Sequence, residues 1–258
     1  MSENLLADML YKSSMRNFGS DEHMQIAGLL KDSKKNVIDT QSAIEIRQLL
    51  NNDPHAIERG LNFIQRPKSP VWYEWGLETR SGHGGNEHVK TGCLVTPHEF
   101  DENLMLAVTG WSTDGVDARH AFAVALFDTE TMAQISKIAR SRRNSTADAS
   151  LSRIMNCIEV TMPPGFNDEI DILTGSDPFA KERSYRDATA EIPFLLTIML
   201  LEQTKGGLTG TQTENVTRQT LSPSPKKGCM REFFDNARKR KNYFSIPNWK
   251  GSSPVWYR

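Results

Sequence analysis

The sequence predicts an α+β protein in which an antiparallel sheet of four to six strands packs against flanking helices. Two observations predict this class. Between residues 71 and 128, short apolar and aromatic runs are separated by turn residues, a pattern typical of an antiparallel meander. On both sides of this region, apolar residues recur at helical spacing instead. A chain of 258 residues is long enough to bury one sizeable core and to carry extensions.

We divide the chain into four segments. Residues 1–66 are expected to be a helical segment, and residues 67–203 the α+β core. Residues 204–225 are rich in Gly, Thr, Gln and Ser and are expected to form a polar linker or a surface excursion. Residues 226–258 form a basic C-terminal segment that is expected to end in a strand.

Four strands are predicted in the core, and the first of them carries two tryptophans. Trp72 and Trp75 are separated by an odd number of residues, so their side chains point to opposite faces of a strand. Both are large enough to need cover, which predicts a sheet with packing on both faces. The predicted strands are Val71 to Thr79, Val89 to Thr96, Leu104 to Thr113 and His120 to Asp128.

Helices are predicted before and after these strands. Asp53-Pro54 is a helix start, because aspartate caps the first turn and proline suits the first helical position. Asp128-Thr129 is a second cap. Phe194 to Leu201 is apolar on all sides, so this helix is expected to be buried in the core. Apolar stripes lie at Ile44, Ile46, Leu49 and Leu50, at Met132, Ile135 and Ile138, and at Leu151, Ile154, Met155 and Ile158.

Composition indicates a protein of a reducing cytoplasm. The three cysteines, Cys93, Cys157 and Cys229, are odd in number and far apart, which argues against a disulfide scaffold. The N-terminal residues lack the apolar stretch of a signal peptide. The longest apolar run, Ile192 to Leu201, is half the length that a membrane span requires. We therefore expect no membrane contact.

A basic block is the strongest indication of a partner. Residues 226–241 carry seven basic residues against Glu232 and Asp235, a local charge of +5 in a chain of net charge −1. Such asymmetry is typical of a segment that meets a polyanion or an acidic partner, and the Phe233-Phe234 pair could stack on bases. A solvated basic tail is the alternative. The predicted binding residues are Lys226, Lys227, Arg231, Arg238, Lys239, Arg240 and Lys241.

A histidine series is the candidate metal site. His83, His88, Cys93 and His98 recur at intervals of five, with Glu87 and Glu99 beside them. Side-chain types of this kind bind zinc, but the interval is not one that structural zinc sites use. In a strand, a step of five also reverses the face. Surface histidines are therefore the favoured interpretation, and no metal is expected.

Other chemical motifs are weaker. Asp168, Glu169, Asp171 and Asp177 have ligand types for a hard cation, but the pattern of a calcium loop is missing, and the start of a helix is the favoured interpretation. The sequence contains no Walker loop, no dinucleotide-binding glycine pattern, no H-E-x-x-H and no C-x-x-C. No cofactor is expected.

Four landmarks give the chain a resemblance to a known family. They are the aromatic strand Pro70 to Trp75 with an internal acid, the next strand Thr91 to Val95, the apolar helix Phe194 to Leu201, and the basic run Asn236 to Lys241. In this order they resemble a family of bacteriophage- and prophage-encoded proteins, mainly of proteobacteria. The resemblance implies a viral or prophage context inside a bacterial cell. It implies no activity and transfers no site residues.

These observations favour a non-enzymatic phage or prophage accessory protein. Its basic C-terminal segment is expected to bind a nucleic acid or an acidic host partner. Two alternatives stay open. The first is a small metal-dependent hydrolase that uses residues among His83, His88 and His98. The second is a virion or assembly component.

Overall fold

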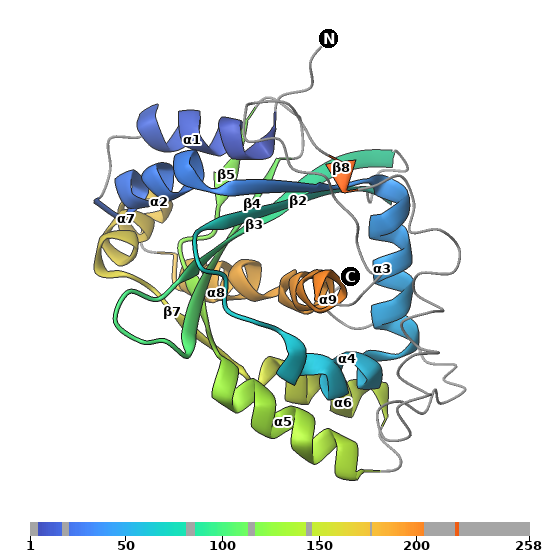
Figure 1. Cartoon of the computed structure of the whole chain (residues 1–258). Helices are drawn as coiled ribbons and strands as arrows, with labels where there is room; N and C mark the ends of the chain where they lie inside the picture. The colour runs from blue at the N-terminus through green and yellow to red at the C-terminus, as the bar shows by residue number, and fades with distance from the viewer. Residues whose placement is uncertain are drawn as a thin grey trace.

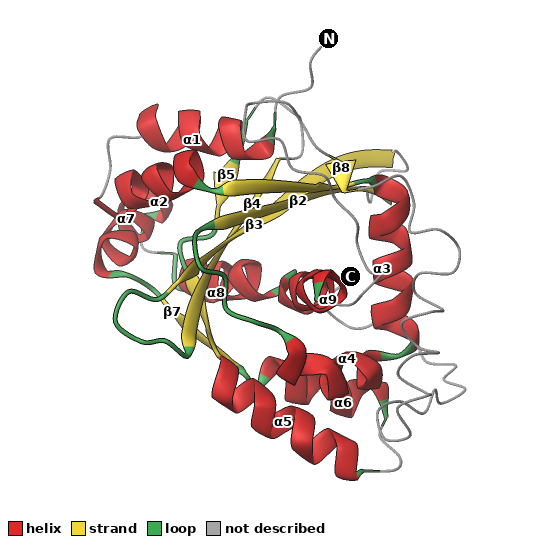
Figure 2. Ribbon diagram, in the orientation of Figure 1, coloured by secondary structure: helices red, strands yellow, loops and turns green. Residues whose placement is uncertain are grey.

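A single sheet lies between two layers of helices. The computed structural model describes residues 5–16, 21–80, 86–112, 117–142, 146–175, 177–203 and 220–221. Helices α1 and α2 cover one face of the sheet, and α3, α4, α5, α6 and α9 lie on the other side (Figures 1 and 2). This arrangement confirms the predicted α+β class.

Helices and strands are interspersed along the described chain. The strands are β1 Lys34–Ile38, β2 Val71–Arg80, β3 Asn86–Pro97, β4 Leu104–Ser112, β5 Arg119–His120, β6 Val124–Asp128, β7 Ile158–Thr161 and β8 Thr220–Leu221. The helices are α1 Leu6–Arg16, α2 Asp21–Asp32, α3 Thr40–Asn52, α4 Pro54–Gly60, α5 Thr129–Ser141, α6 Ala147–Met155, α7 Pro164–Thr174, α8 Ala180–Thr189 and α9 Ile192–Glu202, with a 3-10 turn η1 at Leu61–Phe63.

The antiparallel meander forms the middle of the sheet. The strand order is β7-β6-β4-β3-β2-β1-β8, and β5 pairs with β4 outside this path. Strands β2, β3, β4 and β6 pair antiparallel in sequence order, as the sequence predicted. The predicted strand from His120 to Asp128 is divided into β5 and β6 by a bend.

Two strands lie where the sequence predicted helix. Residues Lys34–Ile38 form β1, which pairs parallel with β2 and extends the same sheet. This strand has only five residues, and of these Asn36 and Ile38 are buried, so no apolar alternation was visible. The stripe from Leu151 also ends early: α6 stops at Met155, and Ile158 begins β7. The helical spacing of Ile158 was a coincidence, since its partner is Phe127 in β6.

The two tryptophans of β2 lie in different cores, as predicted. Trp72 packs with Leu6, Leu10 and Phe166 beneath α1 and α2. Trp75 packs on the other face, and its ring centroid lies 4.8 Å from that of Phe194 in α9. Both side chains are buried. Because Trp72 and Trp75 point to opposite faces of β2, each face of the sheet has its own core.

Glu74 is the acidic residue inside the aromatic strand β2, and its hydrogen bonds explain why an acid lies there. Its buried carboxylate accepts hydrogen bonds from the backbone N–H of Leu6, at 2.9 Å, and from the indole Nε1 of Trp72, at 3.0 Å. Leu6 is the first residue of α1, so the carboxylate satisfies a backbone donor that a helix start leaves open. Burial raises the pKa of Glu74, and these hydrogen bonds oppose the rise.

Gly92 lets the Trp72 indole cross the neighbouring strand. Gly92 pairs with Glu74 in the β2–β3 register. A Cβ atom at residue 92 would overlap the Trp72 ring and would lie 2.6 Å from the carbonyl oxygen of Tyr73. Glycine is therefore required here for packing, because it has no side chain to displace the indole.

Helix α9 is the central helix of the larger core, as predicted. Its residues from Ile192 to Leu201 are all buried. A Cβ atom at Gly60 would lie 2.6 Å from Leu200 Cδ2, so α4 and α9 are in close contact. Among the described residues, no helix has both the length and the apolar character needed to cross a membrane.

Candidate functional site

Most of the predicted site residues lie outside the part of the chain that the structure describes. The basic residues from Lys226 to Lys241 lie outside the described residues, as does His83. His88 lies in β3, where only the backbone is described. His98 follows β3, and its Nδ1 accepts a hydrogen bond from the backbone N–H of Phe100 at 3.3 Å. In the described part of the chain, no group of three or more His, Cys, Asp or Glu side chains is placed to hold a metal ion.

Cys93, the fourth member of the histidine series, faces the larger core. Its side chain is fully buried, and its Sγ lies 3.6 Å from Thr109 Oγ1. Burial raises the pKa of this thiol to about 12. A thiol of this kind is a poor nucleophile and a poor metal ligand at neutral pH, because both roles need the thiolate.

A cavity of about 440 Å³ lies where six elements meet. Helices α1, α2, α7 and α8, the end of β4 and the segment around β5 supply its walls. Among the residues that line it are Ser14, His23, Trp111, Arg119, His120, Glu169, Ser184 and Asp187. The volume is within the usual range of ligand pockets, about 300–1,000 Å³.

A histidine–carboxylate pair forms one wall of the cavity. His23 Nδ1 on α2 lies 3.1 Å from Glu169 Oε2 on α7. Only 5% of the His23 side chain and 17% of the Glu169 side chain are exposed. The two atoms are close enough to form an ion pair when the imidazole is protonated, although Glu169 Oε2 accepts no hydrogen bond from a described residue. The sequence analysis placed Glu169 at a helix start, whereas it lies inside α7 and faces His23.

His120 packs directly beside this pair. Its ring centroid lies 4.6 Å from that of His23 and 5.3 Å from that of Phe166. Its Nδ1 lies 2.9 Å from the carbonyl oxygen of Ala121, and because a carbonyl only accepts, Nδ1 carries the proton. Burial lowers the pKa of His120 to about 4, with a smaller lowering from His23, although the ring borders the cavity. His120 is therefore neutral at pH 7.

Two buried hydroxyls in the cavity wall have no hydrogen-bond partner among the described residues. Ser14 on α1 and Ser184 on α8 are 2% and 5% exposed, and neither Oγ atom is bonded within the described residues. A buried hydroxyl without a partner costs free energy, so such groups are rare unless something else satisfies them. Asp187, on the same helix as Ser184, also lines the cavity, and burial raises the pKa of its carboxyl group.

The cavity residues carried no local signal in the sequence. His23, His120 and Glu169 come from three separate elements and belong to no motif. Only the packing of α2 and α7 against each other, beside β5, brings them together. Histidine and carboxylate residues are too common for a pairing across such a separation to be predicted from a single chain.

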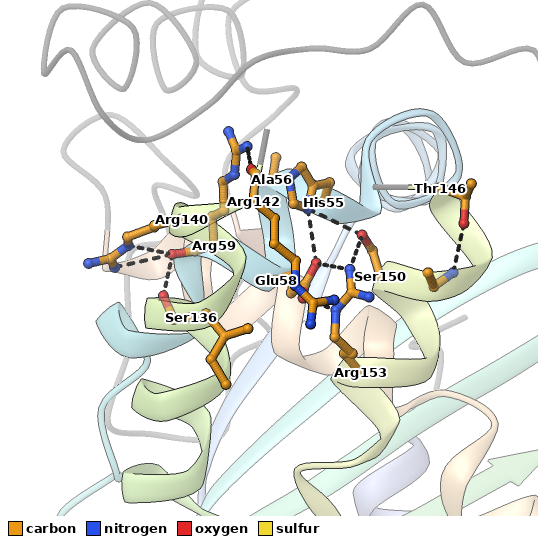
Figure 3. Close-up of polar contacts among 12 residues, drawn as sticks. His55, Ala56, Glu58, Arg59, Ser136, Arg140, Arg142, Thr146, Ser150 and Arg153 are labelled. Carbon is orange, nitrogen blue, oxygen red and sulfur yellow. Dashed lines mark hydrogen bonds and ion pairs between the residues drawn. The ribbon is translucent and has the colours of Figure 1, made fainter. Parts of the chain in front are cut away.

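A second polar cluster joins α4 to α6 (Figure 3). Glu58 is fully buried and accepts hydrogen bonds from Arg153, with Nη2 at 3.0 Å from Oε2. His55 Nδ1 lies 2.9 Å from the same Glu58 oxygen and 3.2 Å from Ser150 Oγ. A catalytic triad needs its serine and its acid on opposite ring nitrogens, whereas here both meet Nδ1. We therefore assign this cluster to stability.

Helix α4 is capped by Asp53, a buried aspartate whose ionisation is unfavourable. Asp53 caps α4 through a 3.1 Å hydrogen bond from the N–H of Ala56 to Oδ1, and its buried Oδ2 has no partner among the described residues. Burial raises the pKa of Asp53 to about 6. Because the folded pKa exceeds the unfolded one, this group lowers stability progressively as the pH rises from about 4 to about 6.

Asp53→Asn should therefore stabilise the protein above pH 6. Asparagine keeps the capping oxygen but cannot ionise, so the free energy of unfolding should rise by at most about 3 kcal/mol, and the gain should vanish below pH 4. Urea denaturation at several pH values measures the difference from the unchanged protein. Asp128→Asn is the matched control at the cap of α5, because hydrogen bonds, the largest from Thr131, lower the pKa of Asp128. That variant should lose stability at neutral pH, and a gain in both variants would refute the assignment.

Comparison with known proteins adds no family to this description. No protein-family model, curated protein or solved structure matches the chain. The chemistry of the cavity has to be inferred from the side chains that line it.

Proposed function

We propose that the cavity binds a small polar ligand and that His23 exchanges a proton with it. The observation that carries this proposal is the His23–Glu169 pair in the wall of a 440 Å³ cavity. Large cavities with a few convergent polar groups are the usual location of binding and active sites in proteins.

The chemistry of the wall supports a role in proton transfer. Glu169 Oε2 lies 3.1 Å from His23 Nδ1, where its carboxylate would stabilise the imidazolium that forms if the ring accepts a proton from the ligand. The rings of His120 and Phe166 pack against His23 and shield it from solvent. A shielded imidazole exchanges its proton with a bound ligand in preference to bulk water, because the ligand excludes water from the site.

Closing the cavity mouth should abolish ligand binding. Leu173 lines the cavity and is 64% exposed, so Leu173→Trp should obstruct the entrance without disturbing the core. Ile172→Trp is the matched control, because Ile172 is a neighbour that is 80% exposed and does not line the cavity. Saturation-transfer NMR with a library of small polar compounds should show binding to the unchanged protein and to the control, but not to Leu173→Trp. Equal binding to both variants, or no binding compound at all, would refute the proposal.

Proton exchange needs a separate readout. His23→Gln keeps a polar side chain of similar size but cannot gain a proton. For a compound that binds the cavity, the variant should lose the proton exchange that accompanies binding, which calorimetry in buffers of different ionisation enthalpy measures. His98→Gln, outside the cavity, is the control and should keep it.

We also propose a second function for the basic segment, namely contact with a nucleic acid or an acidic partner. The local charge of +5 over residues 226–241 supports it. The resemblance of four landmarks to bacteriophage and prophage proteins is the support for a role in a phage or prophage inside a bacterial cell. The two proposals rest on separate observations, the cavity lining and the charge of residues 226–241, and they are tested separately.

Four alanines in the basic run should weaken nucleic-acid binding without unfolding the protein. Each phosphate contact contributes about −0.9 to the slope of log affinity against log salt on duplex DNA. Replacing Arg238, Lys239, Arg240 and Lys241 by alanine should therefore flatten the slope and leave the Tm nearly unchanged. Titration of labelled single- and double-stranded DNA and RNA at two salt concentrations measures the slope. If no nucleic acid binds at low salt, an acidic protein is the remaining partner; if the Tm collapses in the variant, the segment is structural.

A further inference from the structure

Beyond the histidine pair, the cavity presents three kinds of binding group that proton transfer does not use. Trp111 at the end of β4 supplies an aromatic wall. Arg119 in β5 supplies a cation. The Ser14 and Ser184 hydroxyls and the Asp187 carboxyl group supply short hydrogen-bonding groups. Their combination restricts the chemical class of the ligand.

The aromatic wall favours a planar ring. Trp111 is partly exposed, and it lines the cavity together with Phe122 and Leu173. A partly exposed indole beside other apolar side chains is the surface on which a flat ring stacks, and stacking of a base on such a side chain contributes about 1–3 kcal/mol.

The charges of the wall favour an anion near Arg119. Glu169 lies 3.1 Å from His23, and Arg183 Nη2 lies 2.5 Å from Asp177 Oδ2, so both of these side chains already have a polar partner. Arg119 is exposed, has no ion pair with a described residue, and lies opposite Trp111 in the β4–β5 register. A guanidinium group binds a phosphate through two parallel hydrogen bonds. A ring stacked on Trp111 and an anion bound by Arg119 can therefore belong to one molecule.

The hydroxyl groups favour a ligand that itself carries hydroxyls. Each serine can donate one hydrogen bond and accept two, and a carboxyl group such as that of Asp187 can accept from a sugar hydroxyl. Ser14 and Ser184 are nine-tenths buried or more, so a ligand that bonds their hydroxyls offsets the cost of burying them.

From these groups we infer that the cavity binds a nucleoside monophosphate, or a compound with the same planar ring, hydroxyls and single phosphate. The ring stacks on Trp111, the phosphate meets Arg119, and the sugar hydroxyls bond Ser14, Ser184 and Asp187. A cavity of 440 Å³ suits one such molecule and is too small for a duplex. The inference rests on the proposed ligand-binding function of the cavity and names its ligand.

Calorimetric titration with the four ribonucleoside 5′-monophosphates tests the inference. At least one should bind, and the matching nucleoside and ribose 5-phosphate should each bind at least about tenfold more weakly, because each lacks one recognised group. The titration is repeated with the fourfold alanine variant of residues 238–241, which should bind equally well if the cavity is the site. Loss of binding in that variant, or equal binding of inorganic phosphate, would overturn the inference.

Single replacements separate the recognised groups. Arg119→Gln should weaken the monophosphate at least about tenfold and leave the nucleoside unchanged. Trp111→Leu should weaken the nucleoside and the monophosphate, but not ribose 5-phosphate. Arg142→Gln, at an exposed arginine outside the cavity, is the control and should change neither. Identical effects of Arg119→Gln and Arg142→Gln would contradict the assignment of the phosphate.

The outcome also distinguishes this inference from the proposed function. If other compounds bind and Leu173→Trp excludes them, while no nucleotide binds, the cavity is a ligand site and the nucleotide inference is wrong. If no compound binds the unchanged protein, both are wrong.

Discussion

Glu58→Ala should lower the free energy of unfolding by about 3–5 kcal/mol. Glu58 is fully buried and is the shared acceptor of Arg153 and His55, which hold α6 and α4 together. Removing one member of a buried ion pair leaves the remaining charge in a poorly solvated site, which usually costs this amount. Urea denaturation followed by circular dichroism measures the loss.

An exposed ion pair provides the control for this variant. Asp171 Oδ2 lies 3.2 Å from Lys181 Nζ, with 47% and 40% of the two side chains exposed. Asp171→Ala should therefore change stability by no more than about 1 kcal/mol. A loss below about 1 kcal/mol for Glu58→Ala as well would show that the buried cluster contributes no more than a surface pair.

The pH dependence of the same variant gives a second test. Burial alone would raise the pKa of Glu58, but hydrogen bonds from His55, Arg153 and Ser150 lower it overall. A lowered folded pKa means that the carboxylate contributes stability above its unfolded pKa and loses that contribution as the pH falls. The difference between the unchanged protein and Glu58→Ala should therefore decrease in acid.

Trp75→Ala should cost about 3–5 kcal/mol by opening a cavity in the larger core. The Trp75 side chain is 1% exposed and packs against Phe194 of the central helix α9. The core can relax only partly around so large a void. The loss in free energy of unfolding therefore includes both the transfer free energy of the side chain and the lost packing contacts. Trp72→Ala should cost a similar amount on the other face, because Trp72 is also 1% exposed.

Two further variants define what would contradict this expectation. Phe100 is 87% exposed, so Phe100→Ala should change the free energy of unfolding by no more than about 0.5 kcal/mol. Trp75→Phe keeps a ring in the core and should cost less than Trp75→Ala. Equal and small losses for Trp75→Ala and Phe100→Ala would mean that the second face of the sheet is not packed.

Local pattern by itself determined the meander and the central helix. Alternation along β2, β3 and β4 gives each strand its faces, so the parity of Trp72 and Trp75 was enough to predict two cores. Phe194 to Leu201 is apolar around its whole circumference, which only a buried helix tolerates. The caps at Asp53 and Asp128 were also predicted, because a helix start needs an acceptor within three residues.

The tertiary structure alone decided strands β1 and β7 and the cavity. Strand β1 is short and polar at its start, and its parallel pairing with β2 is what makes it a strand. Strand β7 continues a helical stripe in sequence and leaves it only because β6 offers an open edge. His23, His120 and Glu169 become neighbours only when α2 and α7 pack beside β5. The spacing of apolar residues predicts which face of a helix or strand is buried. It does not predict which distant element covers that face.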